Sequence, residues 1–262
     1  MKPVQWGETY ASFFPFLICE RSVMNRQIVC TTLIAVFCLS ATRPLLADDT
    51  RVEVTAKKPP STTLNGLPLV YHTDFEENAD HWHPTDPEAW KLQELDNRAV
   101  FALTKKVSDY KPKVRSPFNQ AILQSVTVTD FVLDVQLKST EPDYNHRSLC
   151  LFFGHQDPSH FYYVHFGKKT DDHANQIFIV NDAPRTKIST KTTPGTNWDD
   201  EWHHARIVRD VESGSIKVYF DDMEEPVMTA TDKTFKHGKV GIGSFDDRGV
   251  YSRVTLYGKK KD

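Results

Sequence analysis

The segment of residues 148–167 constrains the fold more than any other part of the chain. Its sequence, SLCLFFGHQDPSHFYYVHFG, holds two runs of aromatic and aliphatic residues on either side of a Gln-Asp-Pro-Ser turn. This pattern predicts a β-hairpin whose turn is centred near Pro158. Both faces of the hairpin are rich in apolar side chains, so each face needs another part of the protein to cover it.

A turn near Pro158 would pair Phe152 with Val164 and Phe153 with Tyr163, and side chains alternate between the faces of a strand. The predicted core face then consists of Cys150, Phe152, Tyr162, Val164 and Phe166. The opposite face consists of Leu149, Leu151, Phe153, His155, Phe161, Tyr163 and His165. Polar rings among apolar groups suit a groove for a polyhydroxylated ligand. A half-covered sheet face with polar rings at its rim explains the same residues equally well.

The remainder of the chain is rich in short strand signals and has little helical periodicity. Strands are predicted at residues 69–75, 90–95, 98–103, 130–138, 176–181, 186–189, 202–209, 215–220, 227–231, 239–245 and 250–257. One helical turn is expected within residues 76–86. This spacing predicts an all-β fold, a two-sheet antiparallel sandwich or jelly roll.

Residues 1–47 differ from the rest and resemble an export signal. Asn25 and Arg26 precede an apolar run at residues 28–39, and Ala47 offers a small residue for cleavage. The signal is predicted to begin at Met24, with residues 1–23 as an upstream extension. The run is too short for a comfortable membrane span, although an N-terminal anchor is the alternative. We therefore expect an exported protein, periplasmic or extracellular, without a stable membrane span after cleavage.

Removal of residues 1–47 leaves 215 of the 262 residues and changes the net charge from −3 to −5. Residues 48–66 are predicted to be a polar linker, residues 67–258 the jelly-roll domain and residues 259–262 a basic tail. The negative charge, and the lack of a basic run interleaved with aromatic residues, argue against nucleic acid as a partner. Cys150 is the one cysteine of the processed chain and is expected to be a buried thiol.

The C-terminal half carries a family resemblance. WHHARIV at 202–208 is followed by a Gly214 turn, IKVYF at 216–220 and GKVGIGSF at 238–245. Together with FYYV at 161–164, Arg185 and the Asp74-Phe75 pair, these motifs resemble the laminin-G-like and concanavalin A-like jelly rolls. Within that group they resemble the bacterial 3-keto-disaccharide hydrolase-like domains. The resemblance covers residues 67–258 and implies a carbohydrate-related role.

The strand at residues 202–209 offers a second set of polar side chains. Trp202, His204 and Arg206 lie on its predicted non-core side and would extend the groove of the central hairpin. Aromatic faces pack against sugar C–H groups, and arginine donates hydrogen bonds in its plane. The predicted ligand-binding set is Arg147, Phe153, His155, Tyr163, His165, Arg185, Trp202, His204 and Arg206. A Trp202 that merely plugs the edge of the sandwich is the alternative.

Catalytic and metal-binding motifs are largely missing from the sequence. Neither Glu94 with Asp96 nor Glu141 with Asp143 is followed by the second glutamate that retaining glucanases of this fold class use. No metal site is supported by histidine spacing, and no cofactor is predicted. Asp74, Asp246 and Asp247 raise the alternative of a structural Ca²⁺ ion, but an Asx-type turn accounts for the last two.

Three functions remain open at this stage. The first is an exported module that binds an oligo- or polysaccharide without turnover. The second, implied by the resemblance, is a hydrolase or lyase acting on a 3-keto-disaccharide or a related glycan, with His155, Asp157 and His165 as acid–base candidates. In that case Arg147 or Arg185 would steady an anion. The third is a protein-interaction sandwich, which would expose an apolar patch. The oligomeric state is not predicted.

Overall fold

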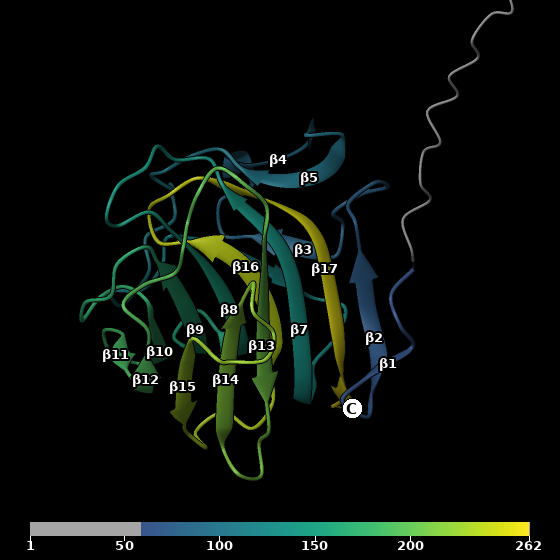
Figure 1. Ribbon diagram of the computed structural model, residues 1–262, viewed down its shortest axis with the longest axis vertical. Helices are drawn as coiled ribbons and strands as arrows, with labels where there is room; N and C mark the ends of the chain where they lie inside the picture. The colour runs from purple at the N-terminus through teal and green to yellow at the C-terminus, as the bar shows by residue number, and fades with distance from the viewer. Residues whose placement is uncertain (1–58, 262) are drawn as a thin grey trace, which may run out of the picture. The chain divides into compact units, whose positions relative to one another are not determined.

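A computed structural model describes residues 59–261, and their regular secondary structure is β-strand apart from one short 3₁₀ turn (Figure 1). The predicted signal peptide and the linker up to residue 58 lie outside the described residues. Among the residues described, no helix is long and apolar enough to cross a membrane.

The larger of the two sheets has ten strands, all paired antiparallel, and is called the large sheet below. Its main path, in spatial order, is β1 (Thr63–Leu64), β2 (Leu67–Thr73), β17 (Gly249–Lys260), β7 (Val128–Ser139), β13 (His203–Arg209), β14 (Ser215–Phe220), β15 (Met228–Thr231) and β12 (Ser189–Thr192). A hairpin of β4 (Trp90–Leu95) and β5 (Arg98–Leu103) joins the sheet through β17. Figure 1 shows β17, β7, β13 and β14 running side by side.

The other sheet has seven antiparallel strands and is called the small sheet. Its spatial order is β11 (Thr186–Lys187), β10 (Gln176–Asn181), β9 (His160–Gly167), β8 (Ser148–Asp157), β16 (Lys239–Ser244), β6 (Asn119–Leu123) and β3 (Trp82–Pro84). The central hairpin of the sequence is therefore β8 and β9, in the middle of this sheet.

One apolar core joins the inner faces of the two sheets. The rings of Phe131 on β7 and Phe153 on β8 lie 5.9 Å apart, and those of Phe220 on β14 and Phe166 on β9 lie 5.6 Å apart. Such face-to-face packing of antiparallel sheets is how a β-sandwich buries its apolar side chains. The predicted all-β, two-sheet jelly-roll sandwich, the architecture of concanavalin A-like domains, is confirmed.

The register of the central hairpin differs from the predicted one by a single residue. Phe152 pairs with Tyr163 and Phe153 with Tyr162, and a bulge follows in which Gly154 has a φ of +57°. A shift of one residue turns every side chain of a strand to the opposite face. The faces predicted for β9 are confirmed, whereas those of β8 before the bulge are inverted. Phe153 belongs to the core, and Cys150 and Phe152 point outward.

Several other predicted elements agree with the structure. The hairpin of β4 and β5 turns at Asp96 and Asn97, both of which have positive φ, and β10 and β11 lie within the predicted strands 176–181 and 186–189 and pair with each other. The sequence did not predict β3, β6 or β12. The helical turn lies at Pro87–Ala89, just after residues 76–86 rather than within them.

Both ends of the described chain contain more strand than predicted. β1 lies inside the predicted linker and turns into β2 through Asn65 and Gly66, whose φ values are +51° and +75°. β17 continues to Lys260, and the Lys259 ammonium lies 2.7 Å from the Asp130 carboxylate. These two lysines belong to the sheet rather than to a tail.

Candidate functional site

The outer face of the small sheet is sealed by other parts of the protein. Tyr163 is 0 % exposed and His165 is 7 % exposed. The apolar residues on this face form an outer cluster of Ile122, Cys150, Phe152, Phe161, Tyr163, Phe178 and Val180. The prediction that Phe153 lines an outer groove is wrong, because the register of β8 turns this ring into the core. Phe153, Tyr163 and His165, three rings of the predicted outer face, are all closed to solvent.

Arg185 and the segment between β5 and β6 cover part of this face. The Arg185 Nη1 donates a 2.8 Å hydrogen bond to the Tyr163 hydroxyl, and its guanidinium lies 4.8 Å from the Phe178 ring. Its backbone N–H donates to the Arg115 carbonyl, and Val114 packs against the outer cluster. Arg185 therefore stabilises the cover and is not presented to a ligand.

The three acid–base candidates do not form a shared site. The His155 ring stacks on Phe161 at 5.5 Å, and burial lowers the pKa of His155 to about 4. Burial, helped by the positive charge of Arg185, lowers the pKa of His165 to about 3. The Asp157 carboxylate lies in the turn, where it accepts hydrogen bonds from the Ser159 backbone N–H and the His160 ring. We find two neutral, packed imidazoles and a turn-stabilising carboxylate rather than an acid–base pair.

Arg147 and Trp202 form hydrogen bonds within the protein. Arg147 is 1 % exposed and donates hydrogen bonds to the Ser139 carbonyl and the Asp200 carboxylate. The Trp202 indole N–H donates to Asp96 at 3.0 Å, in the turn of the β4–β5 hairpin. The Trp202 ring also packs against the small apolar cluster beneath that hairpin. This placement matches the alternative in which Trp202 plugs an edge.

His204 and Arg206 lie on the outer face of the large sheet. Their neighbours on β13, Ala205 and Ile207, belong to the core, so alternation turns His204 and Arg206 away from it. The core separates this surface from the outer face of the small sheet. The predicted single groove joining them to Tyr163 and His165 is therefore wrong, since the two sets lie on opposite sides of the sandwich.

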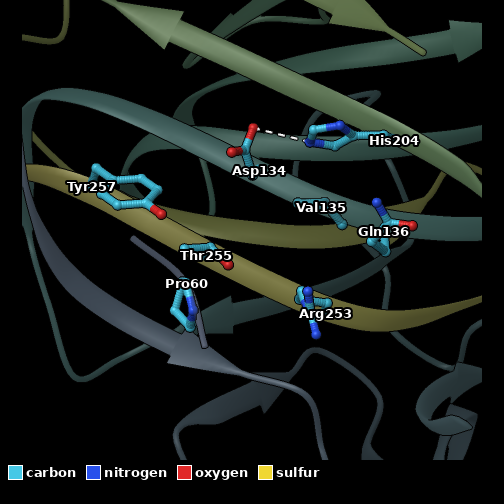
Figure 2. A pocket seen from close by; sticks show the side chains of 8 residues that line it. All are labelled: Pro60, Asp134, Val135, Gln136, His204, Arg253, Thr255 and Tyr257. Carbon is cyan, nitrogen blue, oxygen red and sulfur yellow. Dashed lines mark ion pairs between the residues drawn. The ribbon is translucent and has the colours of Figure 1, made fainter. Parts of the chain in front are cut away.

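A polar hollow does lie beside His204, and we call it the sheet pocket. Its volume is about 190 Å³. Its walls come from β7, β13, β17 and the chain just before β1, as Figure 2 shows: Pro60, Asp134, Val135, Gln136, His204, Arg253, Thr255 and Tyr257. Strands from distant parts of the sequence thus contribute to one site.

Asp134 is the charged centre of the pocket wall. Its carboxylate receives two hydrogen bonds from Arg206, of 2.6 and 2.9 Å, and its Oδ1 lies 3.2 Å from the His204 Nε2 (Figure 2). Burial alone would raise the pKa of Asp134, but the hydrogen bonds from His204 and Arg206 outweigh it and hold the pKa below its usual value. Asp134 is thus an ionised, neutralised carboxylate that orients its two partners.

Two other polar side chains of the pocket, Gln136 and Arg253, are unpaired within the described residues. None of residues 59–261 accepts a hydrogen bond from the Arg253 guanidinium or exchanges one with the Gln136 amide. The Thr255 hydroxyl contacts the His72 Nδ1 at 3.0 Å. A ligand in the sheet pocket would therefore meet donors and acceptors that the protein leaves available.

Five functional candidates on this face escaped the sequence analysis: Asp134, Gln136, Arg253, Thr255 and Tyr257. The alternation of DFVLDVQLK at 130–138 was a signal for the first two, because Asp134 and Gln136 alternate with Leu133, Val135 and Leu137. That signal marks an outward face but does not reveal which strands lie beside it.

The residues proposed for calcium are not gathered around a site. Asp247 is buried, and its carboxylate accepts hydrogen bonds from the Tyr144 hydroxyl and the Ser148 backbone N–H. The Asp74 carboxylate accepts from the Glu76 N–H in a local turn, and Asp246 is exposed. Within the described part of the chain, no group of three or more His, Cys, Asp and Glu side chains is placed to hold a metal ion.

No family model and no curated protein sequence matches this chain. Solved structures do resemble it. The carbohydrate-binding module CBM66 from Bacillus subtilis is 16 % identical, with 68 % of this chain and 96 % of that chain covered and a TM-score of 0.48. Basic winged bean lectin with Tn-antigen is 15 % identical, with 73 % and 98 % covered and a TM-score of 0.48. Peanut lectin with a 9mer peptide is 12 % identical, with 73 % and 97 % covered and a TM-score of 0.48.

Similarity at this level carries no information about the ligand of this chain. Its function is therefore inferred from its own side chains. The finer resemblance to 3-keto-disaccharide hydrolase-like domains stays a prediction.

Proposed function

We propose that this protein binds carbohydrate without turning it over, and that the sheet pocket is the binding site. One observation carries the proposal: unpaired polar side chains, Gln136 and Arg253, face a hollow that also contains the ring of Tyr257. A half-exposed polar side chain that is not paired within the protein can hydrogen-bond water or a ligand. Groups left free around a hollow are therefore available to a polar ligand.

The chemistry of the pocket suits a sugar ring. Sugar hydroxyls both donate and accept hydrogen bonds, and the Gln136 amide does the same, whereas Arg253 donates only. Tyr257 is only 5 % exposed, but it lines the same hollow and adds an aromatic wall to it. The volume of about 190 Å³ is smaller than the pockets that hold drug-sized molecules, which suits one sugar unit of a longer chain.

The pocket lacks the paired carboxylates of most glycosidases. Asp134 is the one carboxylate among the lining residues, and Arg206 and His204 already occupy it. Glycoside hydrolysis ordinarily uses two carboxyl groups on either side of the bond to be cleaved. A hydrolase or lyase is the second candidate function, favoured by the contact between His204 and Asp134, which would make His204 the base.

The test is calorimetric titration of the full chain with a panel of neutral and acidic oligosaccharides, together with an assay of reducing-end release. We expect binding without release. Gln136→Met should weaken binding about 10-fold, since it removes polar contacts worth roughly 1.4 kcal/mol and keeps the shape of the side chain. Lys217→Met, on β14 of the same sheet but outside the pocket lining, is the control and should bind normally.

The two candidate functions are separated by the outcome. If the unmodified chain releases reducing ends and His204→Gln does not, the hydrolase or lyase function replaces the binding function. Unchanged affinity in Gln136→Met would remove the sheet pocket from consideration, and a panel without any binding would contradict the carbohydrate proposal as a whole.

Export is proposed as well, on the pattern of residues 24–47. An exported protein would meet polysaccharide outside the cytoplasm. N-terminal sequencing of the protein recovered from the periplasm or medium should begin at Asp48, and a chain that keeps Met24 would contradict the proposed cleavage.

A further inference from the structure

We infer that the sugar held in the sheet pocket carries an anionic group, a carboxylate or a sulfate, and that Arg253 recognises it. The inference rests on the proposed carbohydrate function and deepens it, because it names the class of sugar. It follows from the balance of charge around the pocket and from the position of Arg253 in the sheet.

Arg253 differs from three other basic side chains of the same strands, Lys138, Arg206 and Lys259, each of which is paired with a carboxylate. Lys138 on β7 lies 2.8 Å from Asp96, and Lys259 on β17 lies 2.7 Å from Asp130. Arg206 on β13 is held by Asp134. Arg253 has no carboxylate partner among residues 59–261. A guanidinium without a counter-ion in a concave site attracts an anion.

The charges at the pocket do not cancel. Asp134 supplies one negative charge, whereas Arg206 and Arg253 supply a positive charge each, so that the net charge of these three groups is +1. The positive charge of Arg253 also acts on the nearby ring of His72. Burial is the main cause of the lowered pKa of His72, and the positive charge of Arg253 lowers it further, more than Asp74 raises it.

The register of the sheet places a second donor beside Arg253. Arg253 on β17 lies opposite Gln136 on β7, and Gln136 lies opposite His204 on β13. The guanidinium fork and the amide N–H₂ are therefore neighbours on one row across the sheet. An arginine fork matches the two oxygens of a carboxylate or sulfate and forms strong charge-assisted hydrogen bonds.

The experiment compares three trisaccharides that differ in charge: oligogalacturonate, its neutral oligogalactose counterpart and a sulfated oligogalactose. Each is titrated into the full chain by calorimetry in 20, 150 and 500 mM NaCl. We expect at least one acidic ligand to bind about 10-fold more tightly than the neutral one at low salt, and this preference to shrink as salt rises because free ions screen the attraction. The carboxylate and sulfate arms distinguish the two anions.

Arg253→Met removes the charge and keeps the length of the side chain. It should abolish the preference for acidic ligands, so that acidic and neutral ligands bind the variant equally, while Lys217→Met retains the preference. Equal binding of acidic and neutral ligands by the unmodified chain, or a preference that survives Arg253→Met, would overturn the inference and leave carbohydrate binding intact. Failure of all three ligands, and of the wider panel, would overturn the carbohydrate function and this inference together.

Discussion

The outer faces of the two sheets carry different side chains and differ in how far other parts of the protein cover them. The small sheet turns aromatic rings outward, and Arg185 and the chain between β5 and β6 help to cover them. The large sheet turns polar side chains outward and leaves them accessible, with Asp134 held between Arg206 and His204. The first face is a second core, whereas the second face is a surface with a hollow.

The difference shows in the state of the histidines. On the sealed face, the Nδ1 atoms of His155 and His165 are buried without a hydrogen-bond partner, and the lowered pKa values of both rings keep them neutral. On the open face, His204 lies beside a carboxylate. A polar ring in an aromatic-rich strand is therefore not by itself a sign of a binding groove, because burial can neutralise it.

The largest expected effect is on packing at the sealed face. Phe152→Ala should lower the free energy of unfolding by about 3–5 kcal/mol, because it leaves a cavity in the outer cluster. The smaller truncation Val208→Ala on the open face should cost less than about 1 kcal/mol, as expected for a half-exposed residue. Urea unfolding at pH 7 measures both. Similar losses in the two variants would erase the contrast between the faces.

The next effect is on the pH dependence of stability. The pKa of His165 is about 3 in the folded chain and about 6.5 when unfolded, so the unfolded state takes up the proton first as pH falls. The contribution of neutral His165 to the free energy of unfolding is complete above pH 6.5 and declines below it. At pH 5 about 2 kcal/mol of this contribution is lost. His165→Gln should remove that part of the difference between unfolding free energies at pH 8 and pH 5. An unchanged difference would show that His165 can accept a proton in place.

The smallest effect is expected at the ion pair of the open face. Arg206→Met should lower the free energy of unfolding by about 1.5 kcal/mol at pH 7, because it removes two charge-assisted hydrogen bonds from Asp134. The hydrogen bonds of Asp134 lower its pKa, so this contribution is present above pH 4 and is lost as pH falls through the folded pKa. Urea unfolding should show a smaller loss at pH 3 than at pH 7. A loss of equal size at pH 3 would assign it to packing.

The sequence predicted the layers of this fold better than their faces. Alternation identified β7, β9, β13 and β14 correctly, since each strand carries its own pattern of inward apolar residues. The faces of β8 depended on where the turn lies, and an error of one residue inverted them. The bulge at Gly154 was not visible in the sequence, because glycine also suits ordinary turns.

The sheet pocket was harder to predict than the fold for a related reason. All but one of its lining residues come from β7, β13 and β17, which are neighbours in space but lie far apart in the sequence. His204 and Arg206 were recognised as outward-facing. Their partner Asp134, however, lies on another strand, 72 residues before Arg206 in the sequence. Local patterns reveal which side chains leave the core but not which ones meet.

The outward turn of Cys150 supplies a chemical probe of the sealed face. Its thiol is 0 % exposed, lies in the outer cluster with Tyr163 and is the one cysteine in residues 59–261. Burial raises the pKa of this thiol and so disfavours the reactive thiolate. A maleimide or disulfide reagent can therefore react with Cys150 only when the chain that covers the outer cluster opens. The rate of labelling would therefore time the opening of that covering in the folded chain, without any engineered reporter.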